Sequence, residues 1–290
     1  MISIFTGHSF DNLTPHGWQT FFTSLQETNS NLVNLFLGSN KIDNHGMELL
    51  MRRLVSNMIS LKHLSLRYND LVSPTGWQAL TGYLQSPNFA LETLDLEGNN
   101  INDDIVTAFT SALVNNKTLE QIHLYQEVDS DSDYDADVDN ELITERGWEA
   151  MSTLLCNKSS MLDTYNSNHT LHKVSDNHEE MNLPDDLVSY LELNENKDKA
   201  EVIRQKIVQT HFSGSGDCVS SKMQVLLDME LEMMPTAIAW MGRPTHDGWR
   251  GTNVSGLSLM YNLIRRVPDL FDSSPLKKKS STTGKRKHVA

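Results

Sequence analysis

The chain has 290 residues, 38% of them hydrophobic, and a net charge of −14; this composition supports a packed core in one large domain or two modest ones. The acidic excess argues against nucleic-acid binding, because the phosphate backbone would be repelled. Two cysteines make no disulfide framework, the first residues lack a signal-peptide pattern and no apolar run is long enough to cross a membrane, so we expect a soluble cytoplasmic protein.

The first elements in chain order are a short strand and a helix. Ile2 and Ile4 fit the tail of a strand, and Gly17-Trp18 opens an amphipathic run. A glycine followed by a large apolar residue returns at Gly46-Met47, Gly76-Trp77 and Gly147-Trp148. Apolar residues then recur at helical spacing, as at Trp77, Leu80 and Leu84. We therefore expect each pair to mark a helix start with a core anchor.

Three segments match one template, LxxLxLxxNx(L/I), at every position. They start at Leu32, Leu61 and Leu91, carry Asn40, Asn69 and Asn99 at the Asn position, and end at Ile42, Leu71 and Ile101. The starts are 29 and 30 residues apart, and a fourth segment, 28 residues later at Leu119, lacks the Asn. A fifth, degenerate strand is expected around Leu171 and Val174, because Asn168-His-Thr-Leu171 echoes Asn116-Lys-Thr-Leu119. Such periodic self-similarity predicts a repeat architecture.

The segments resemble leucine-rich repeats of the long, ribonuclease-inhibitor-like kind, over roughly residues 1–178. The resemblance implies an α/β fold: a right-handed β-α solenoid shaped as a horseshoe, with a parallel sheet on the concave face and helices outside. In such a fold stacked repeats share one core, because no single repeat can bury its own leucines. It also implies that the Asn side chains bond to the backbone of adjacent repeats, which makes them structural.

Residues that alternate with the inward leucines are predicted to form columns on the open face of the sheet, because neighbouring strands lie roughly 4.8 Å apart. The columns are Asn34, His63, Thr93 and Gln121; Phe36, Ser65, Asp95 and His123; and Gly38, Arg67, Glu97 and Tyr125. We expect a protein partner to contact Phe36, His63, Ser65, Arg67, Tyr68, Asp95, Glu97, His123 and Tyr125. Aromatic and Arg side chains carry much of the energy of protein interfaces. The alternative is that Arg67 with Glu97, and Asp95 with His123, only neutralise each other.

An acidic segment interrupts the repeats at residues 126–142. Residues 127–141 hold eight Asp or Glu and no Lys or Arg. An EF-hand calcium loop beginning at Asp129 would need Gly and Glu where the chain has Tyr134 and Asn140. We expect a solvated, disordered loop without a metal. Calcium binding and phosphorylation at Ser130 or Ser132 stay as alternatives.

Beyond residue 183 the template is absent and helices are expected. Leu183-Pro184-Asp185-Asp186 fits a helix start, and residues 198–211, 219–234 and 255–266 have helical patterns. We interpret residues 183–274 as a helical cap over the open end of the solenoid. Degenerate last repeats followed by a helical tail more loosely resemble leucine-rich-repeat proteins of unicellular algae such as diatoms.

The last segment, residues 275–290, is predicted to be a disordered basic tail. Residues 276–290 carry six Lys or Arg and no acid. Arg265-Arg266 and Lys277-Lys278-Lys279 have the spacing of a bipartite nuclear-import signal. The nucleus is therefore an alternative to the cytoplasm.

The sequence contains no HExxH, GxSxG, paired CxxC or Gly-rich phosphate loop. Cys156 lies near His169 and His172 in the sequence, but a buried structural cysteine is the commoner case. We predict a protein without enzymatic activity, cofactor, metal or small-molecule substrate: a scaffold that binds a protein through the concave face. The alternative is a regulator of a small GTPase, because Ran-type GTPase activators share the long-repeat fold and carry an acidic region. Their acidic region follows the repeats, whereas this one interrupts them, so that analogy is at fold level only.

Overall fold

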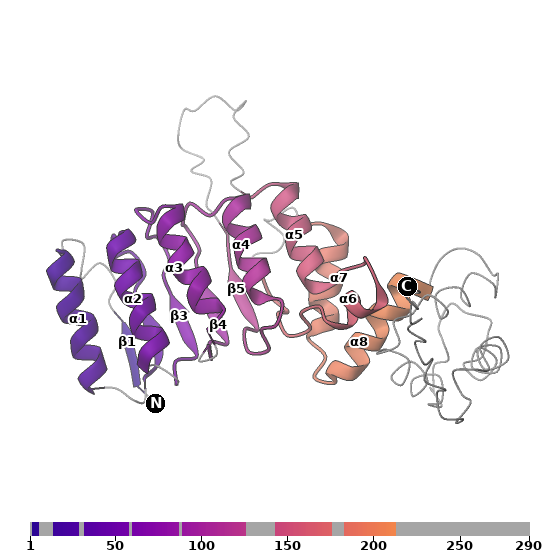
Figure 1. Cartoon of the computed structure of the whole chain (residues 1–290), viewed down its shortest axis with the longest axis horizontal. Coiled ribbons are helices and arrows are strands. Elements are labelled where there is room, and N and C mark those ends of the chain that lie inside the picture. The colour runs from indigo at the N-terminus through magenta and orange to yellow at the C-terminus, as the bar shows by residue number, and fades with distance from the viewer. Residues whose placement is uncertain are drawn as a thin grey trace, which may run out of the picture. The chain divides into compact units, whose positions relative to one another are not determined.

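Each repeat contributes one short strand to a single parallel sheet (Figure 1). The strands are β1 (Ile2–Phe5), β2 (Leu32–Phe36), β3 (His63–Ser65), β4 (Thr93–Asp95) and β5 (Gln121–His123). They lie side by side in chain order, and every neighbouring pair is parallel. β1 confirms the strand expected at Ile2 and Ile4. The fifth repeat strand is reduced to one parallel bridge between Gln121 and Lys173.

A helix follows each of the first four strands, and these helices stack side by side over one face of the sheet (Figure 1). They are α1 (Pro15–Thr28), α2 (Asn44–Asn57), α3 (Pro74–Leu84) and α4 (Asp103–Leu113); α5 (Glu145–Leu155) extends the row. The Gly-apolar pairs lie in the first turns of α1, α2, α3 and α5, as expected from the sequence. After them come α6 (Met161–Tyr165), α7 (Asp185–Asn194), α8 (Lys199–Ile207) and a π-helical turn at Val208–Phe212.

The computed structural model describes residues 2–5, 14–28, 32–57, 60–86, 89–125, 143–175 and 183–212. The chain divides into two units, Met1–Gly214 and Ser215–Ala290, and all described residues belong to the first. The predictions for the acidic segment at 126–142, for helices at 219–234 and 255–266 and for the basic tail at 275–290 lie outside the described residues.

The inward side chains form one continuous core, as the repeat template requires. Leu35, Leu64, Leu94 and Ile122 pair in register across β2 to β5, and each is at most 1% exposed. Apolar residues of the helices, such as Trp77 of α3, close the core from the other side. Stacking therefore buries what a single repeat would leave in water.

The asparagines at the end of the strands tie neighbouring repeats together. Asn69 Nδ2 donates to Leu37 O of the preceding repeat at 3.0 Å, and Asn69 Oδ1 accepts from Ile42 N at 2.9 Å. Asn99 Nδ2 likewise donates to Leu66 O at 3.0 Å. The structural role expected for these side chains is confirmed.

The repeat resumes in register after the acidic segment, at α5. Ile143 is buried at the position that Ile101 occupies one repeat earlier. Asp103, at the start of α4, accepts hydrogen bonds from Thr144 N at 2.8 Å and Thr144 Oγ1 at 2.6 Å. Burial would raise the pKa of Asp103, but these bonds and the charge of Arg146 outweigh it and lower that pKa. The start of α5 is thus fixed to α4 by side chains on either side of residues 126–142.

The helices after the repeats continue the row of packed helices. α7 packs against α5, and α8 contacts α6 and α7. Lys206 of α8 is fully buried, and its Nζ donates to Leu155 O, at the end of α5, at 2.7 Å. Residues 183–212 thus pack against α5 and donate a hydrogen bond to its last residue.

Candidate protein-interaction face

The three predicted columns of outward side chains are present on the sheet. Strand pairing aligns Asn34, His63, Thr93 and Gln121 in one column and Phe36, Ser65, Asp95 and His123 in the next. The third column, Gly38, Arg67, Glu97 and Tyr125, follows from bonds that Ser39 N, Tyr68 N and Gly98 N donate to the carbonyl oxygens of Arg67, Glu97 and Tyr125. We call these three columns the outward face.

The predicted contact residues differ in how much of them solvent reaches. Ser65 and His123, in the middle column, are only 5% and 8% exposed. Tyr68 is 38% exposed, and the other six predicted contact residues are half-buried. The accessible part of the outward face therefore lies toward the end of the strands, around Arg67 and Tyr68.

Arg67 is the centre of a polar network on this accessible part. Its guanidinium forms ion pairs with Glu97 and, at 3.7 Å, with Asp95. It also lies 5.6 Å from the centroid of the Tyr68 ring, and Tyr68 Oη donates to Glu97 at 3.3 Å. Burial alone would lower the pKa of Arg67, but Asp95, Tyr68 and Glu97 raise it. The ion pair between Arg67 and Glu97, on which the alternative interpretation rests, is therefore present.

Two features of this region are not visible in the repeat template alone. Lys62 Nζ and Glu92 Oε1 form an ion pair at 2.9 Å just before β3 and β4. Leu71 occupies the last template position but is 55% exposed, whereas the following residue, Val72, is buried. The template match at Leu71 was therefore not a core position.

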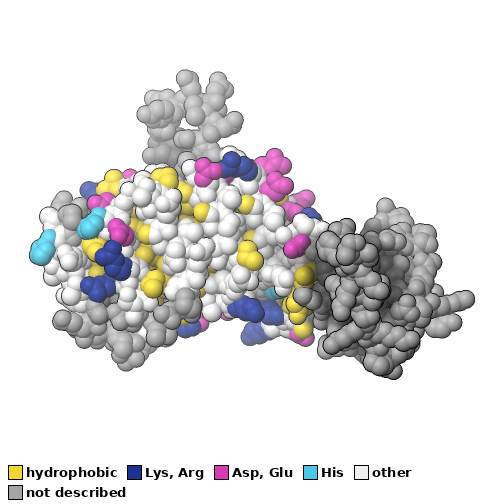
Figure 2. All heavy atoms as spheres, viewed as in Figure 1, with side chains coloured by type: hydrophobic (Ala, Val, Ile, Leu, Met, Phe, Trp, Pro, Cys, Tyr) yellow, Lys and Arg dark blue, Asp and Glu magenta, His cyan; other side chains and the backbone are white. Residues whose placement is uncertain are grey.

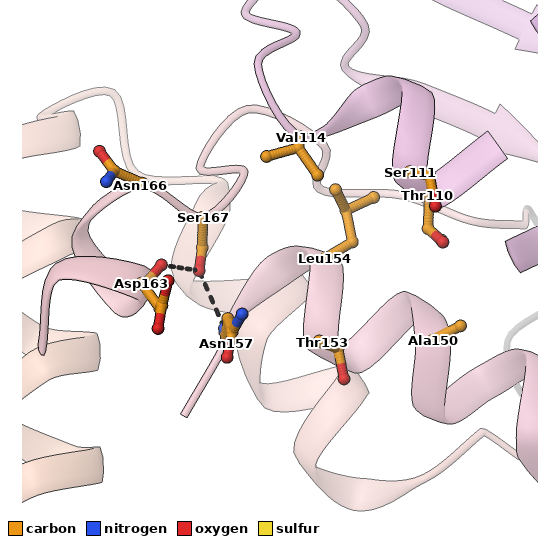
Figure 3. Close-up of a pocket in the computed structure, with 10 residues that line it drawn as sticks. All are labelled: Thr110, Ser111, Val114, Ala150, Thr153, Leu154, Asn157, Asp163, Asn166 and Ser167. Atoms are coloured by element: carbon orange, nitrogen blue, oxygen red, sulfur yellow. Dashed lines mark hydrogen bonds between the residues drawn. The ribbon is translucent and has the colours of Figure 1, made fainter. Parts of the chain in front are cut away.

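The helical side of the molecule contains a small pocket. A pocket of about 200 Å³ lies between α4, α5 and α6, and Figure 3 shows its lining as small, mostly polar side chains. Within it Ser167 Oγ donates to Asp163 O and accepts from Asn157 N, both at 2.9 Å. In Figure 2 the middle of this helical face is mostly uncharged, with isolated hydrophobic side chains. The pocket brings together no set of titratable groups suited to catalysis.

Two other kinds of feature, metal-ligand clusters and membrane-spanning helices, were sought in the described ranges. No group of three or more His, Cys, Asp or Glu side chains there is placed to hold a metal ion. No helix in these ranges is long and apolar enough to cross a membrane. Cys156 is buried, with Sγ 3.4 Å from Thr210 Oγ1.

Comparisons with known proteins agree with the repeat geometry. A family model described as a leucine-rich repeat matches residues 57–80 and 88–109. No curated protein matches the chain. The two matched stretches hold β3 with the first seven residues of α3, and β4 with the first seven residues of α4. Residues 57–80 and 88–109 are therefore similar to leucine-rich repeats, modules that generally bind other proteins.

Proposed function

We propose that this protein is a non-enzymatic scaffold that binds a protein partner through the outward face of its repeats. The observation that carries the proposal is the cluster of Arg67, Tyr68, Asp95 and Glu97 at the accessible end of that face. It combines an arginine, an exposed aromatic ring and two carboxylates at and just after the ends of the neighbouring strands β3 and β4. Arginine and tyrosine are among the side chains that contribute most to the energy of protein interfaces.

The ion pairs within the cluster support binding as well as neutralisation. The Arg67 side chain keeps 40% of its surface exposed, whereas those of Asp95 and Glu97 keep only 13% and 14%. The carboxylates thus hold the guanidinium from beneath, and its outer edge stays open. An anchor that is already held in place loses less conformational entropy on binding.

The shape of the repeats is part of the same proposal. Repeat starts 28 to 30 residues apart, with a true helix in the repeats of β2, β3 and β4, are typical of the ribonuclease-inhibitor-like class. We infer a right-handed horseshoe in which the outward face is concave. A concave face would surround a partner with all three columns at once.

A pull-down with the full chain tests the proposed function. Proteins captured by the wild type are identified by mass spectrometry and compared with those captured by an Arg67→Ala/Tyr125→Ala variant. The control is Arg52→Ala, which removes an exposed arginine of α2 that pairs with Glu48. We expect the double variant to lose proteins that the wild type and the control retain. Identical capture by all three would exclude the outward face.

The competing hypothesis is regulation of a small GTPase. It rests on the fold and on the acidic segment at residues 126–142, and no described residue adds to it. GTP hydrolysis by a panel of purified small GTPases, with and without the protein, separates the two functions. The scaffold proposal expects no acceleration, and acceleration of any member would replace it.

We also propose that the protein acts in the cytoplasm. The basic tail at residues 275–290 is the reason to test for nuclear import. Residues 260–290 are fused to a fluorescent reporter. We expect the fusion to have the same distribution between cytoplasm and nucleus as the reporter alone. Accumulation of the fusion in the nucleus would overturn this.

A further inference from the structure

The helix after the repeats is held in place by few apolar and several polar contacts. Three side chains of the nine-residue helix α8 are buried: Val202, Lys206 and Ile207. In the π-helical turn that follows, Thr210 Oγ1 lies 3.4 Å from Cys156 Sγ. His211 Nε2 of the same turn lies 2.8 Å from Thr164 Oγ1 of α6. A helix this short is not stable alone, so α8 stays folded only while it is docked.

Lys206 lies at the centre of this contact and its charge meets only neutral acceptors. Its side chain is 0% exposed. Its Nζ donates to Leu155 O at 2.7 Å and to Asn168 O at 3.3 Å, and it lies 3.3 Å from His169 Nδ1. The three protons of an ammonium group thus have three acceptors. Hydrogen bonds are satisfied, but no negative charge repays the loss of water around the ammonium.

The ionisable groups around Lys206 do not provide that negative charge. Four of them act on it from the surrounding elements: Cys156 at the end of α5, His169 after α6, Tyr190 of α7 and Lys199 of α8 itself. None of the four is a carboxylate. The acidic residue of α8, Glu201, instead pairs with Arg204 at 2.9 Å. The position therefore favours a neutral amine over an ammonium ion.

The docked and open states of α8 consequently differ in how strongly they bind one proton. Burial lowers the pKa of Lys206 to about 7; Cys156 opposes this and Lys199 adds to it. Burial and the charge of Lys206 lower the pKa of His169 to about 4, so its Nδ1 remains an acceptor. A lysine in water has a pKa of about 10.4. Docking thus releases a proton between these values, and acid favours the open state.

We propose that α8 and the π-helical turn, residues 199–212, form a latch on the end of the repeats that opens on acidification, when Lys206 takes up a proton that its buried position cannot offset. The closed state holds the neutral amine, which still has two protons to donate to Leu155 O and Asn168 O. The open state exposes Cys156 and leaves the stacked repeats in place. The latch goes beyond the proposed function and does not depend on what binds the outward face.

Hydrogen exchange of the full chain, followed by mass spectrometry, tests the latch. Exchange at pH 6 and pH 9 is divided by the intrinsic rates at the same pH, for the amides of α8 and, as an internal reference, of α4. The rate of Cys156 alkylation, relative to that of the urea-unfolded chain at the same pH, gives a second readout. Lys206→Met removes the titrating group. The matched control Lys197→Met removes an exposed lysine just before α8.

At pH 6 we expect the amides of α8 to be about tenfold or more less protected than those of α4, because the latch opens without the repeats. Protection of α8, and of Cys156 against alkylation, should rise about tenfold or more from pH 6 to pH 9. Lys206→Met should lack this rise, whatever its absolute level of protection. Lys197→Met should show the same rise as the wild type.

Three results would overturn the latch. Equal protection of α8 and α4 would show that α8 opens only when the whole fold does. Equal protection of α8 at both pH values would show that docking releases no proton. A rise that persists in Lys206→Met, or disappears in Lys197→Met, would assign the titration to another group. None of these readouts uses a binding partner, so failure of the proposed function leaves the test unchanged.

Discussion

Two neighbouring asparagines show how differently the same residue type acts at adjacent positions. Asn99 is buried; its Nδ2 donates to Leu66 O and Leu96 O at 3.0 and 2.7 Å, and its Oδ1 accepts from Asn69 N at 2.8 Å. Asn100 is exposed, with one bond from Nδ2 to Asp70 O at 3.2 Å. Only the first connects backbones of two repeats inside the protein.

Asn99→Ala is therefore expected to lower the free energy of unfolding by about 2–4 kcal/mol, because it leaves several buried backbone groups without partners. Asn100→Ala should change it by less than about 0.5 kcal/mol. Urea denaturation of both variants and the wild type measures the difference. Equal losses would show that the asparagine does not connect the repeats.

Lys206 is the described residue whose charge is most at odds with its surroundings. It is fully buried; its Nζ lies 3.3 Å from His169 Nδ1 and 5.7 Å from the centroid of the Tyr190 ring. Burial is the main cause that lowers its pKa to about 7, and the charge of Lys199 adds to this while Cys156 opposes it. Burial and the charge of Lys206 also lower the pKa of His169 to about 4.

This predicts a pH-dependent stability with a defined sign. Unfolded lysine keeps its proton up to about pH 10.4, whereas Lys206 in the folded chain releases it above about pH 7. The unfolded state then binds more protons between these values, so the free energy of unfolding rises with pH there. Lys206→Met is expected to lack this rise. Urea denaturation from pH 7 to 10 compares the slopes, and the same slope in both proteins would contradict the lowered pKa.

At the scale of elements, α3 contains two glycines with opposite surroundings. A Cβ at Gly76 would lie 2.6 Å from Asn44 Oδ1 and 2.7 Å from Val72 Cγ1. A Cβ at Gly82 would meet nothing within 4 Å. Gly76 lets α3 approach α2 closely, whereas Gly82 faces open space and could carry a side chain.

Gly76→Ala is expected to destabilise the protein by about 1–3 kcal/mol through overpacking. Gly82→Ala should stabilise it by roughly 0.5–1 kcal/mol, because alanine is the better helix former. Thermal unfolding of the pair provides the check. A stabilising Gly76→Ala would mean that α2 and α3 do not pack as closely as described.

The strands and helices of the repeats could be predicted because each is specified locally. The template fixes which residues of a strand point inward, and the Gly-apolar pairs fix where a helix begins. The exposure of Leu71 was not predicted, because Leu71 satisfies the last position of the template, whereas the buried Val72 lies one residue beyond it. The signal that could have found it is the distance from the Asn to the helix glycine, which is one residue longer at Asn69–Gly76 than at Asn40–Gly46.

The environment of Lys206 could not be predicted in the same way. Its partners, Leu155, His169 and Tyr190, lie on three other segments of the chain. No local pattern reports that such segments meet. The same limit applied to exposure on the outward face: strand periodicity predicted its columns, but the burial of Ser65 and His123 depends on the packing of their neighbours.

At the scale of the whole molecule, the account depends on repeats that stack in register and display alternate residues on one face. The proposed interaction face uses that register, because it brings the Arg67 network together on one face. A column of outward residues on successive strands offers a direct way to measure it, because each residue has a neighbour one strand away and another two strands away.

Engineered disulfides along the first column make that measurement. His63 and Thr93 are paired in register, as are Thr93 and Gln121, so their Cα atoms lie about 5 Å apart, within reach of a disulfide. Double cysteine variants at 63 with 93 and at 93 with 121 should form an intramolecular disulfide under mild oxidation, seen by mass spectrometry. The pair at 63 with 121, roughly 10 Å apart, should not. A disulfide in the third variant, or none in the first two, would contradict the stacked sheet.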